Sequence, residues 1–423
     1  MLQVFDSPEA FWRAHPFRSE PDARVTQTVR RILTAVRREG DPALRRLSRE
    51  LDHVAPEALR LPPEAPAQAA VALEPEVREL FLRFISRVRA FHEKQRPNAW
   101  LEQTADGGCV GLQVAPIQRV GVYVPGGRAA YPSTVIMAVV PARVAGVSEI
   151  ALVSPPAEDG WPNPLVLAVA GLLEVGEVYA LGGAQAIAAL AYGTESVRAV
   201  DKIVGPGNAY VNEAKRQVYG TVGIDALAGP TEVAILADHT ADAEYVAHDL
   251  AAQAEHDVDT RVTLITPDAA LIQAVRARLR TLLEGNPRAA VLQAALSRQG
   301  AAVLVSDLEQ GVAVANRLAP EHLQILTRQP EELRVQVRYA GAVFCGPHTP
   351  AVLGDYGAGP NHILPTGGTA RFASALGVWD FLRYTSVLQL SKAAFADLAG
   401  DAVRFAELEG LPNHAQAIRC RDE

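Results

Sequence analysis

Short apolar runs that end in glycine, proline or aspartate, each followed by a helical pattern, dominate residues 119–350 of this chain. Runs of this kind are typical of strands buried on both faces, and their alternation with helices indicates βαβ units around a parallel sheet. The candidate strands span residues 121–125, 149–155, 178–183, 202–207, 232–238, 261–267, 301–307 and 340–347. The sequence therefore predicts an α/β fold with two lobes, one near 119–229 and one that uses 232–350.

The segments on either side of this region have helical patterns. Between residues 24 and 100, apolar side chains recur at helical spacing from Val25 to Val36 and again around 77–91, with a proline-rich break between them. We expect the many arginines there to form a solvated face and not a phosphate groove. After Trp379 the pattern is again that of an amphipathic helix, and no strand partner for this tail is evident.

The composition excludes several classes of protein. The 423 residues are 49% hydrophobic and 21% charged, as in soluble globular chains of two or more domains. The net charge of −8, from 40 basic and 48 acidic residues, lacks the basic excess that is typical of nucleic-acid-binding proteins. Asp6, Glu9 and Arg13 interrupt any signal-peptide core, and the longest uncharged run, 178–194, is too short to span a membrane. The 3 cysteines lack CxxC spacing, which favours a reducing, cytoplasmic compartment.

Three glycine-rich turns directly follow candidate strands in the 119–229 region: VGVYVPGG, ALGGAQAIAAL and KIVGPGNAY. Such turns let backbone N–H groups or a helix N-terminus approach a phosphate. None of the three matches GxGxxG, because the nearest candidate has Tyr210 in place of the third glycine. A single turn of this kind is more often a plain strand-to-helix connection. Three in one lobe, with Tyr123, Gln185 and Asn208 at the turns, leave plain turns and a nucleotide cleft equally open.

A metal site is one interpretation of two polar segments. Gln253 and His256 are three residues apart in a helix-compatible segment, so an amide oxygen and an imidazole would lie on one helix face. Taken alone, such a pair is more often a surface glutamine and a helix-capping histidine than a metal site. Glu409 and His414 stand in the C-terminal tail, where a lone histidine is usually solvated.

Two further segments favour a functional site. Glu321 and His322 stand side by side in LAPEHLQI, where a carboxylate and an imidazole are suited to proton transfer. GDYGAGPNHILPT presents Asp355 and His362 in a glycine- and proline-rich segment too irregular for the interior of a helix or strand. The residues therefore indicate an α/β protein with a nucleotide cleft and a Gln/His/Asp metal site, but they name no substrate.

Together these segments resemble the histidinol dehydrogenase family, which catalyses the last two steps of histidine biosynthesis. The resemblance rests on motifs in a fixed order: RVGVYVPGG, GGAQAIAAL, KIVGPGNAYVNEAKRQV, LAGPTEV, AAQAEHD, APEHLQI, GDYGAGPNHILPT and the tail EGLPNH. GDPAL and FHEKQ in the N-terminal part also match, so essentially the whole chain is covered. The resemblance implies NAD-dependent oxidation of L-histidinol, through L-histidinal, to L-histidine.

The resemblance also implies a zinc ion in each subunit, held by Gln253, His256, Asp355 and His414. Two nitrogen and two oxygen ligands suit zinc and would tolerate manganese. In the family the ion orients the substrate and does not generate hydroxide, which is the templating role among the general roles of metals in catalysis.

Roles for the other polar residues follow from the same resemblance. His322 matches the general base and Glu321 the residue that activates water on the aldehyde. Substrate contacts fall on Thr231, Gln253, His256, His322, Asp355, Glu409 and His414, and NAD contacts on Tyr123, Gln185 and Asn208. The family usually has serine at the position of Thr231, and the hydroxyl is retained here.

The family forms a domain-exchanged homodimer, so the resemblance implies that Glu409 and His414 reach the site of the partner subunit. It also implies two incomplete Rossmann-like lobes, as in aldehyde dehydrogenases, with small helical segments at both ends. The division expected from it is an N-terminal segment of 1–22, a metal-binding and catalytic lobe of 23–118 with 230–375, an NAD-binding lobe of 119–229, and a C-terminal helical tail of 376–423.

Two alternatives stand beside this interpretation. A thiol-dependent aldehyde dehydrogenase needs a nucleophilic cysteine, and Cys345, the one nearest a motif, lies in an apolar strand pattern that favours a place in the core. A divergent binding protein of the same fold would be expected to have lost the acid-base pair, whereas Glu321 and His322 are both present. The sequence therefore favours an enzyme that needs no cysteine.

Overall fold

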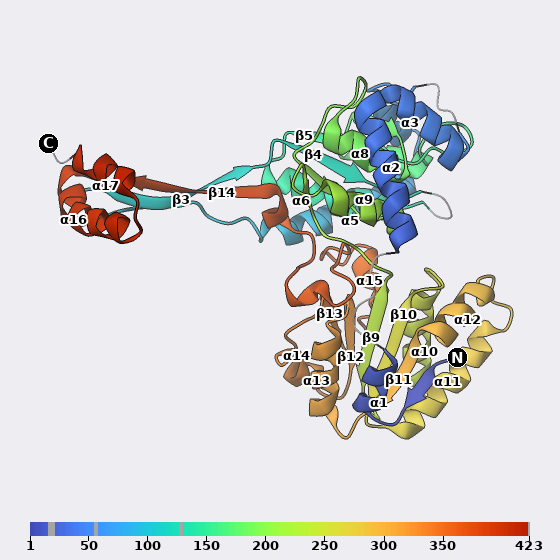
Figure 1. The fold of residues 1–423 in the computed structure, drawn as a ribbon. Helices are drawn as coiled ribbons and strands as arrows, with labels where there is room; N and C mark the ends of the chain where they lie inside the picture. The colour runs from blue at the N-terminus through green and yellow to red at the C-terminus, as the bar shows by residue number, and fades with distance from the viewer. Residues whose placement is uncertain (16–21, 55–57, 127–129, 422–423) are drawn as a thin grey trace.

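Two α/β lobes and a projecting arm make up the fold (Figure 1). The computed structural model describes residues 1–15, 22–54, 58–126 and 130–421. The lobes lie one above the other, and the arm extends sideways from the upper one (Figure 1). The N-terminus lies in the lower lobe, and the described part of the chain ends at residue 421 at the tip of the arm.

The lobe that carries the arm is built on a five-stranded parallel sheet in the order β6-β5-β4-β7-β8. Its elements are β4 (Arg119–Tyr123), α6 (Pro132–Ala145), β5 (Glu149–Ser154), α7 (Pro164–Leu172), β6 (Glu177–Ala180), α8 (Gly183–Tyr192), β7 (Lys202–Val204), α9 (Ala209–Val218) and β8 (Gly223–Ile224). All of β4 is buried, as its unbroken apolar run predicts. The four strands predicted between residues 121 and 207 are confirmed.

The N-terminal helices pack on this five-stranded lobe. They are α2 (Ala23–Glu39), α3 (Asp41–Leu47), the π-helical turn η1 (Ser48–Asp52), α4 (Ala65–Val71) and α5 (Pro75–Glu93). The apolar stripe of α2 shares a core with the alanine-rich α8, while α4 lies against α7 and α5 against α6. This packing differs from the expected division, which grouped 23–118 with 230–375. The helical period of α2 predicts that one face is buried, but it does not show which sheet covers that face.

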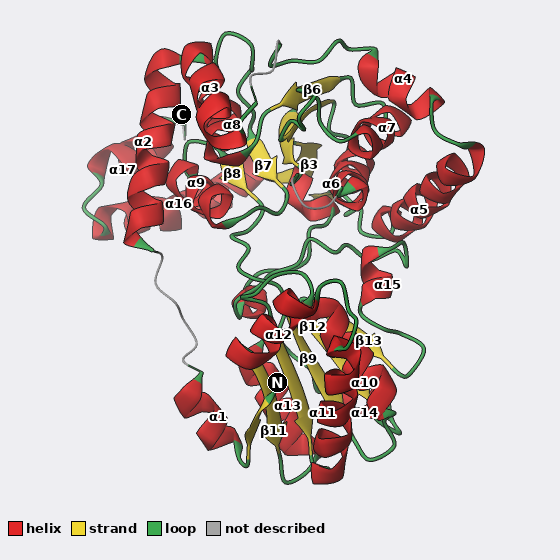
Figure 2. Ribbon diagram, turned by 90° about the vertical axis from the view of Figure 1, so that its right-hand side faces the viewer, coloured by secondary structure: helices red, strands yellow, loops and turns green. Residues whose placement is uncertain are grey.

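The second lobe is built on a six-stranded parallel sheet in the order β1-β11-β10-β9-β12-β13, with helices packed around it (Figure 2). Its strands are β1 (Gln3–Phe5), β9 (Glu232–Ala237), β10 (Arg261–Thr266), β11 (Gly300–Leu304), β12 (His322–Leu326) and β13 (Ala342–Cys345). Its helices are α1 (Pro8–Ala14), α10 (Ala243–Ala254), α11 (Ala269–Leu283), α12 (Ala289–Arg298), α13 (Leu308–Leu318), α14 (Pro330–Arg334) and α15 (Val352–Asp355). The four strands predicted between 232 and 347 are confirmed, and β12 is an additional central strand.

The N-terminal segment belongs to this six-stranded lobe. β1 pairs in parallel with β11, with Gln3 opposite Ala301, and α1 follows it directly. The part of the expected 1–22 segment that the structure describes up to residue 15 is therefore an edge strand and a helix of the lobe. Residues 16–21 lie outside the described part of the chain.

The arm is a three-stranded antiparallel sheet in the order β14-β3-β2, with α16 (Lys392–Leu408) and α17 (Pro412–Arg419) at its tip. Its strands are β2 (Trp100–Gln103), β3 (Cys109–Pro116) and β14 (Leu382–Gln389), and short 3-10 turns η2 (Thr369–Arg371) and η3 (Val378–Phe381) precede β14. The expected helix after Trp379 was wrong at this point, because residues 382–389 pair with β3. Six of the eight residues of β14 are exposed. The segment therefore lacks the alternation of buried and exposed positions from which a strand is predicted.

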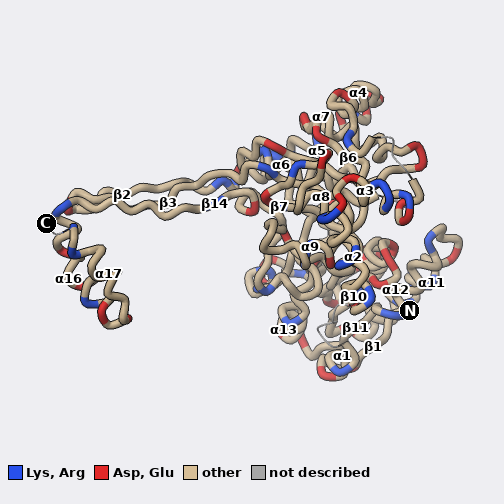
Figure 3. Tube along the Cα trace, turned by 45° about the horizontal axis from the view of Figure 1, so that its top comes forward, with Lys and Arg blue, Asp and Glu red and all other residues tan. Residues whose placement is uncertain are grey.

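Charged residues of both signs are interspersed along the helices and loops of the two lobes, whereas the strands of the arm contain few (Figure 3). The arginines of the N-terminal helices therefore share their surface with acidic residues, as a solvated face predicts. In the described part of the chain, no helix combines the length and the apolar composition that crossing a membrane requires.

Candidate functional site

The two sheets turn opposite ends of their strands toward the junction of the lobes. Only residues 225–231 separate the carboxyl end of β8 from the amino end of β9. All strands within each sheet are parallel, so the carboxyl ends of the five-stranded sheet and the amino ends of the six-stranded sheet face the junction of the lobes (Figure 1). Residues that follow β4, β6 and β7 can thus act together with residues that precede β9 and β12.

A cavity of about 610 Å³ opens at the carboxyl ends of the strands in the five-stranded lobe. Tyr123, Gln185 and Asn208, the three residues expected at NAD, all line it. Pro155 and Asp52 complete one wall. The glycine-rich turns therefore converge on one cleft, although Gly127 of the first turn lies outside the described residues.

Tyr123 and Gln185 are held by the turn that begins α8. The backbone N–H of Gly183 donates to the Tyr123 hydroxyl at 3.2 Å, and burial raises the pKa of that phenol to about 12, so it stays neutral. Gln185 is completely buried, and its Nε2 donates to Asp52 Oδ2 at 3.1 Å. Its Oε1 has no hydrogen-bond partner among the described residues, which leaves one acceptor at the cavity unused.

Asn208 begins α9 as its N-cap. Its Oδ1 accepts from the backbone N–H groups of Tyr210 at 3.0 Å and Val211 at 3.1 Å. The turn before it needs glycine at Gly205, where φ is 116° and a Cβ would meet the carbonyl oxygen of Tyr123 at 2.1 Å. The expected tight turn is therefore confirmed and it borders the cavity, whereas nucleotide binding there stays a prediction.

The second part of the site lies before β9 and β12. Thr231 Oγ1 donates to Glu321 Oε2 at 2.5 Å, and the backbone N–H of Glu232 donates to the same oxygen at 2.9 Å. Gln253, in the last turn of α10, places its Oε1 3.4 Å from Thr231 Oγ1. Glu321 is 8% exposed and Gln253 1% exposed, so this polar cluster is shielded from bulk water.

His322 is oriented by its neighbours. Its Nδ1 lies 3.2 Å from the carbonyl oxygen of Glu232 and 3.5 Å from Glu321 Oε2, and its ring stacks on Phe344. Two acceptors at Nδ1 assign the proton of the neutral ring to that atom and leave Nε2 as the basic nitrogen. Burial works to lower the pKa of His322, but the charge and hydrogen bond of Glu321, with the charge of Asp355, outweigh it and raise the pKa.

Asp355 lies at the end of α15 with His362 beside it, the two joined by a 3.5 Å contact between Asp355 Oδ1 and His362 Nδ1. Burial works to raise the pKa of Asp355, but the hydrogen bond and charge of His362, with the charges of His322 and His256, hold it below its usual range. His256 is exposed in the turn after α10, which ends at Ala254. The expected single helix face for Gln253 and His256 is therefore a helix end and the turn that follows it.

The chain does not by itself bring all the expected metal ligands together. Among the described residues, no three His, Cys, Asp or Glu side chains form a group that could hold a metal ion. His414 in α17 and Glu409 at the end of α16 are both exposed, at the tip of the arm and far from the six-stranded lobe (Figure 1). Gln253, His256 and Asp355 belong to the six-stranded lobe, and the charge of His256 acts on Asp355.

One feature of the Gln253 side chain fits a metal ligand. Its Nε2 is buried and has no hydrogen-bond partner in the described structure. The oxygen and nitrogen of a glutamine amide are nearly the same size, so the amide fits its site in either of two orientations. In the flipped orientation the NH₂ group donates to Thr231, and the oxygen becomes the atom without a partner. A free, buried amide oxygen is a suitable ligand for a borderline cation.

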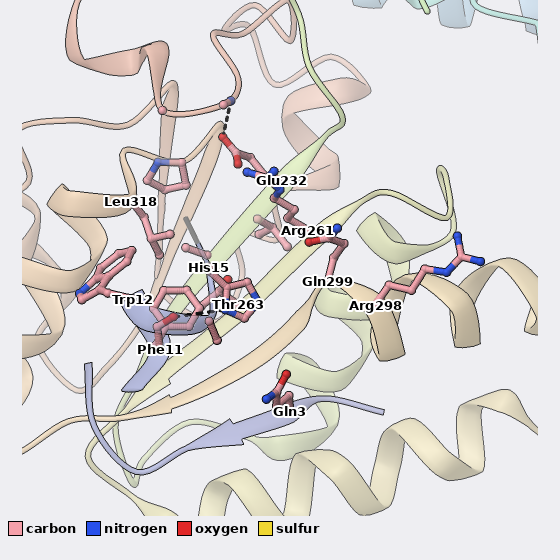
Figure 4. Close-up of a pocket in the computed structure, with 16 residues that line it drawn as sticks. Gln3, Phe11, Trp12, His15, Glu232, Arg261, Thr263, Arg298, Gln299 and Leu318 are labelled. Atoms are coloured by element: carbon pink, nitrogen blue, oxygen red, sulfur yellow. Dashed lines mark hydrogen bonds between the residues drawn. The ribbon is translucent and has the colours of Figure 1, made fainter. Parts of the chain in front are cut away.

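Glu232 is a buried carboxylate that the sequence analysis did not single out. It lines a second cavity, of about 440 Å³, together with Arg261 and His15 (Figure 4). The backbone N–H of Gly367 donates to Glu232 Oε1 at 2.8 Å, and burial, with the charge of Glu321, raises the pKa of Glu232 to about 7. The signal in the sequence is a glutamate at the start of the otherwise apolar strand EVAILA.

The residues expected to act in catalysis, Thr231, Glu321 and His322, sit at the amino ends of their strands. In this they differ from the glycine-rich turns of the five-stranded lobe, which follow the carboxyl ends of their strands. The physical reason is the connection between the sheets, which brings the start of β9 to the junction. Cys345 lies at the opposite end of the β12–β13 pair from His322, and burial raises the pKa of its thiol, so it is poorly placed as a nucleophile.

Comparisons with known proteins agree with this arrangement. The family model for histidinol dehydrogenase matches residues 17–422. A histidinol dehydrogenase of Methylococcus capsulatus is 48% identical over 403 residues, which cover 95% of this chain and 92% of that protein. One of Bordetella parapertussis is 47% identical over 408 residues, which cover 96% of this chain and 92% of that protein.

A solved structure shows the same fold. The crystal structure of histidinol dehydrogenase from Elizabethkingia anophelis has a TM-score of 0.93 to this chain at 32% identity, and the match covers 99% of this chain and 98% of that one. The resemblance stated from the motifs is thereby confirmed over nearly the full length. On these grounds the chain belongs to the histidinol dehydrogenase family.

Proposed function

We propose that this protein oxidises L-histidinol to L-histidine in two NAD-linked steps, by way of L-histidinal, in the cytoplasm. The observation that carries the proposal is the meeting of the two sheets. Glu321 precedes β12 and His322 begins it, at the amino end of a sheet that faces the junction of the lobes. The cleft of Tyr123, Gln185 and Asn208 lies at the carboxyl ends of the other sheet, which face the same junction. A dinucleotide in that cleft and a substrate at the pair would share one site, in which bound NAD accepts a hydride in each oxidation.

The proton steps fall to His322 and Glu321. His322 has Nε2 as its basic nitrogen, because Nδ1 faces the Glu232 carbonyl oxygen, so Nε2 takes the proton of the alcohol. Glu321 accepts from Thr231 and from the N–H of Glu232 through the same oxygen, Oε2. Its other oxygen, Oε1, then serves as the base that activates water for the oxidation of the aldehyde.

Gln253, His256 and Asp355 would hold a zinc ion in each subunit, with His414 of α17 as the fourth ligand. The unpartnered amide atom of Gln253 and the lowered pKa of Asp355 both fit ligands of a divalent cation. When bound, the ion anchors and orients the polar groups of the substrate. Thr231 and Glu409 would add substrate contacts.

The fourth ligand would come from a second copy of the chain in a homodimer. The arm holds α16 and α17 away from the lobes of its own chain (Figure 1). Large apolar side chains are exposed along the arm and its tip, among them Leu388 at 67%, Phe405 at 65% and Leu408 at 71%. Apolar surface of this kind is typical of a protein–protein interface. A partner subunit would cover it and receive Glu409 and His414 into its own site.

The experiment that tests the proposal measures NADH formed per L-histidinol consumed, with and without a chelator. We expect about two NADH per L-histidinol, because each oxidation passes one hydride, and loss of turnover in the chelator that added zinc restores. A ratio near one, or no NADH at all, would contradict the two-step reaction. Full turnover after exhaustive chelation would contradict the proposed need for a metal ion and leave the two-step reaction standing.

A further inference from the structure

The second strand of the five-stranded lobe lacks the acid that dinucleotide-binding folds usually place there. In such folds a carboxylate after the second strand binds the ribose of the adenosine half and selects NAD. Here β5 ends at Ser154, and Pro155 and Pro156 follow it. The next acids, Glu158 and Asp159, are exposed, and neither lines the cavity.

Asp52 fills this place from another part of the chain. It ends the π-helical turn η1 on the N-terminal helices and lines the same cavity as Pro155. A Cβ added to Gly182 would meet Pro155 Cγ at 2.8 Å and Asp52 Oδ1 at 3.2 Å. The carboxylate therefore lies at the carboxyl ends of β5 and β6, where the acid of the second strand is expected.

A buried side chain holds the Asp52 carboxylate in place at the cavity. Gln185, which is fully buried, donates from Nε2 to Asp52 Oδ2 at 3.1 Å and so holds the carboxylate in one orientation. The Oε1 atom of the same amide has no partner among the described residues, which leaves a second acceptor for a ligand hydroxyl or amino group. Among the described residues that line the cavity there is no lysine or arginine that could pair with an additional phosphate.

We propose that Asp52 accepts hydrogen bonds from the ribose hydroxyls of the adenosine half of NAD and makes the site reject NADP. This inference rests on the proposed NAD-linked function. A carboxylate offers acceptors to two neighbouring hydroxyls, whereas the 2′-phosphate of NADP would bring a second negative charge against it. Asp52 is thus the specificity-determining residue, supplied by the N-terminal helices in place of the strand that usually provides it.

The test is calorimetric titration of the dimeric, metal-loaded protein with NAD and NADP in the absence of substrate. The parent protein is expected to bind NAD at least about tenfold tighter than NADP. In Asp52→Asn the NAD affinity should fall about tenfold while that of NADP does not, so the preference disappears. Glu50→Gln, an exposed position on the same turn with the same change in charge, should keep the preference of the parent.

A comparison of 5′-AMP with 2′-deoxy-5′-AMP on the parent protein gives a second readout that needs no variant. Loss of the 2′-hydroxyl should weaken binding about tenfold. An unchanged preference in Asp52→Asn, or equal binding of the two monophosphates, would overturn the inference while leaving NAD binding intact. If the parent protein binds neither dinucleotide, the proposed NAD-linked function fails together with it.

Discussion

Thr231 Oγ1 lies 2.5 Å from Glu321 Oε2 and donates a hydrogen bond to it. The two residues are far apart in sequence but adjacent in space, because β9 and β12 are neighbouring parallel strands and each residue immediately precedes its strand. The bond and the N–H of Glu232 occupy the same carboxylate oxygen, so the orientation of the Glu321 side chain is fixed. Thr231 is therefore a positioning residue for the proposed water-activating carboxylate.

Replacing Thr231 by valine should slow the oxidation of L-histidinal. Valine keeps the shape of threonine and removes the hydroxyl, so Glu321 loses one of its two donors. We expect kcat for L-histidinal to fall about 10- to 100-fold, because a hydrogen bond to a charged group is worth about 1.5–3 kcal/mol. Thr231→Ser keeps the hydroxyl, so its kcat should stay within about threefold of the parent. That limit corresponds to a loss of less than 1 kcal/mol, since 1 kcal/mol is about fivefold. Equal rates in the valine and serine variants would show that the hydroxyl has no such part.

Replacing Glu321 by glutamine should separate the two oxidations. The amide keeps an acceptor for Thr231 but cannot take a proton from water, so aldehyde oxidation should lose more than alcohol oxidation. In single turnover, the NADH formed from L-histidinol should fall from about two per site toward one, while L-histidinal as substrate gives almost none. If the variant completes both steps at the parental rate, another group activates water.

Much of the fold could be predicted from the sequence because both sheets are buried on their two faces. Parallel strands covered by helices have unbroken apolar runs, and all eight predicted runs form strands. β12 was missed because its run HLQIL is short and contains Gln324. The arm was missed for another reason: β14 and β3 pair across more than 260 residues of chain, and most of β14 is exposed, so neither strand shows a period of two.

The candidate site could be predicted in its parts and not in its assembly. Each glycine turn and each acid-base pair stands out locally, whereas Glu232 and Asp52 gain importance only from neighbours distant in sequence. Asp52 meets Gln185, and the Glu232 carboxylate lies close enough to Glu321 for its charge to matter. The period of a helix or strand shows which face is buried but not what covers it, so the helical pattern of residues 23–93 does not predict that these helices pack on the five-stranded lobe.

Mixed dimers should show whether the site is shared. A His322→Asn subunit lacks the base, and a His414→Asn subunit lacks the tail ligand, so either homodimer should be nearly inactive. In the heterodimer with exchanged tails, one site has both histidines intact, and we expect about half of the parental activity. Differently tagged subunits allow the heterodimer to be isolated and its NADH production measured. Complete absence of activity in that species would contradict the exchange of tails.

Replacing Lys215 by methionine should destabilise the five-stranded lobe. Lys215 is 1% exposed, pairs with Asp225 and donates from Nζ to the Gly205 carbonyl oxygen at 3.0 Å. Methionine would leave Asp225 buried without its counter-charge, which costs about 3–5 kcal/mol of unfolding free energy. Lys94→Met, at an exposed position, should change that free energy by less than about 0.5 kcal/mol. Denaturant unfolding of the two variants and the parent measures the difference, and similar midpoints for all three would contradict the role given to the ion pair.

The last prediction concerns Glu232, whose pKa burial, together with the charge of Glu321, raises to about 7. An unfolded chain restores the ordinary value near 4.5. Between these two values the folded protein holds a proton that the unfolded chain has released. The stability linked to this proton is therefore fully present below about pH 4.5 and is lost as the pH rises through about 7.

Glu232→Gln should remove this pH dependence. Glutamine keeps an oxygen that can accept from the Gly367 N–H but carries no titrating group. Relative to the parent, we expect the variant to gain on the order of 2–3 kcal/mol of unfolding free energy between pH 5 and pH 8, since one pKa unit corresponds to about 1.4 kcal/mol. Denaturant unfolding of both proteins across this range measures the gain. Glu64→Gln, an exposed change of the same charge, should instead follow the parental profile. Parallel profiles for Glu232→Gln and the parent would show that Glu232 ionises in the folded protein as it does in water.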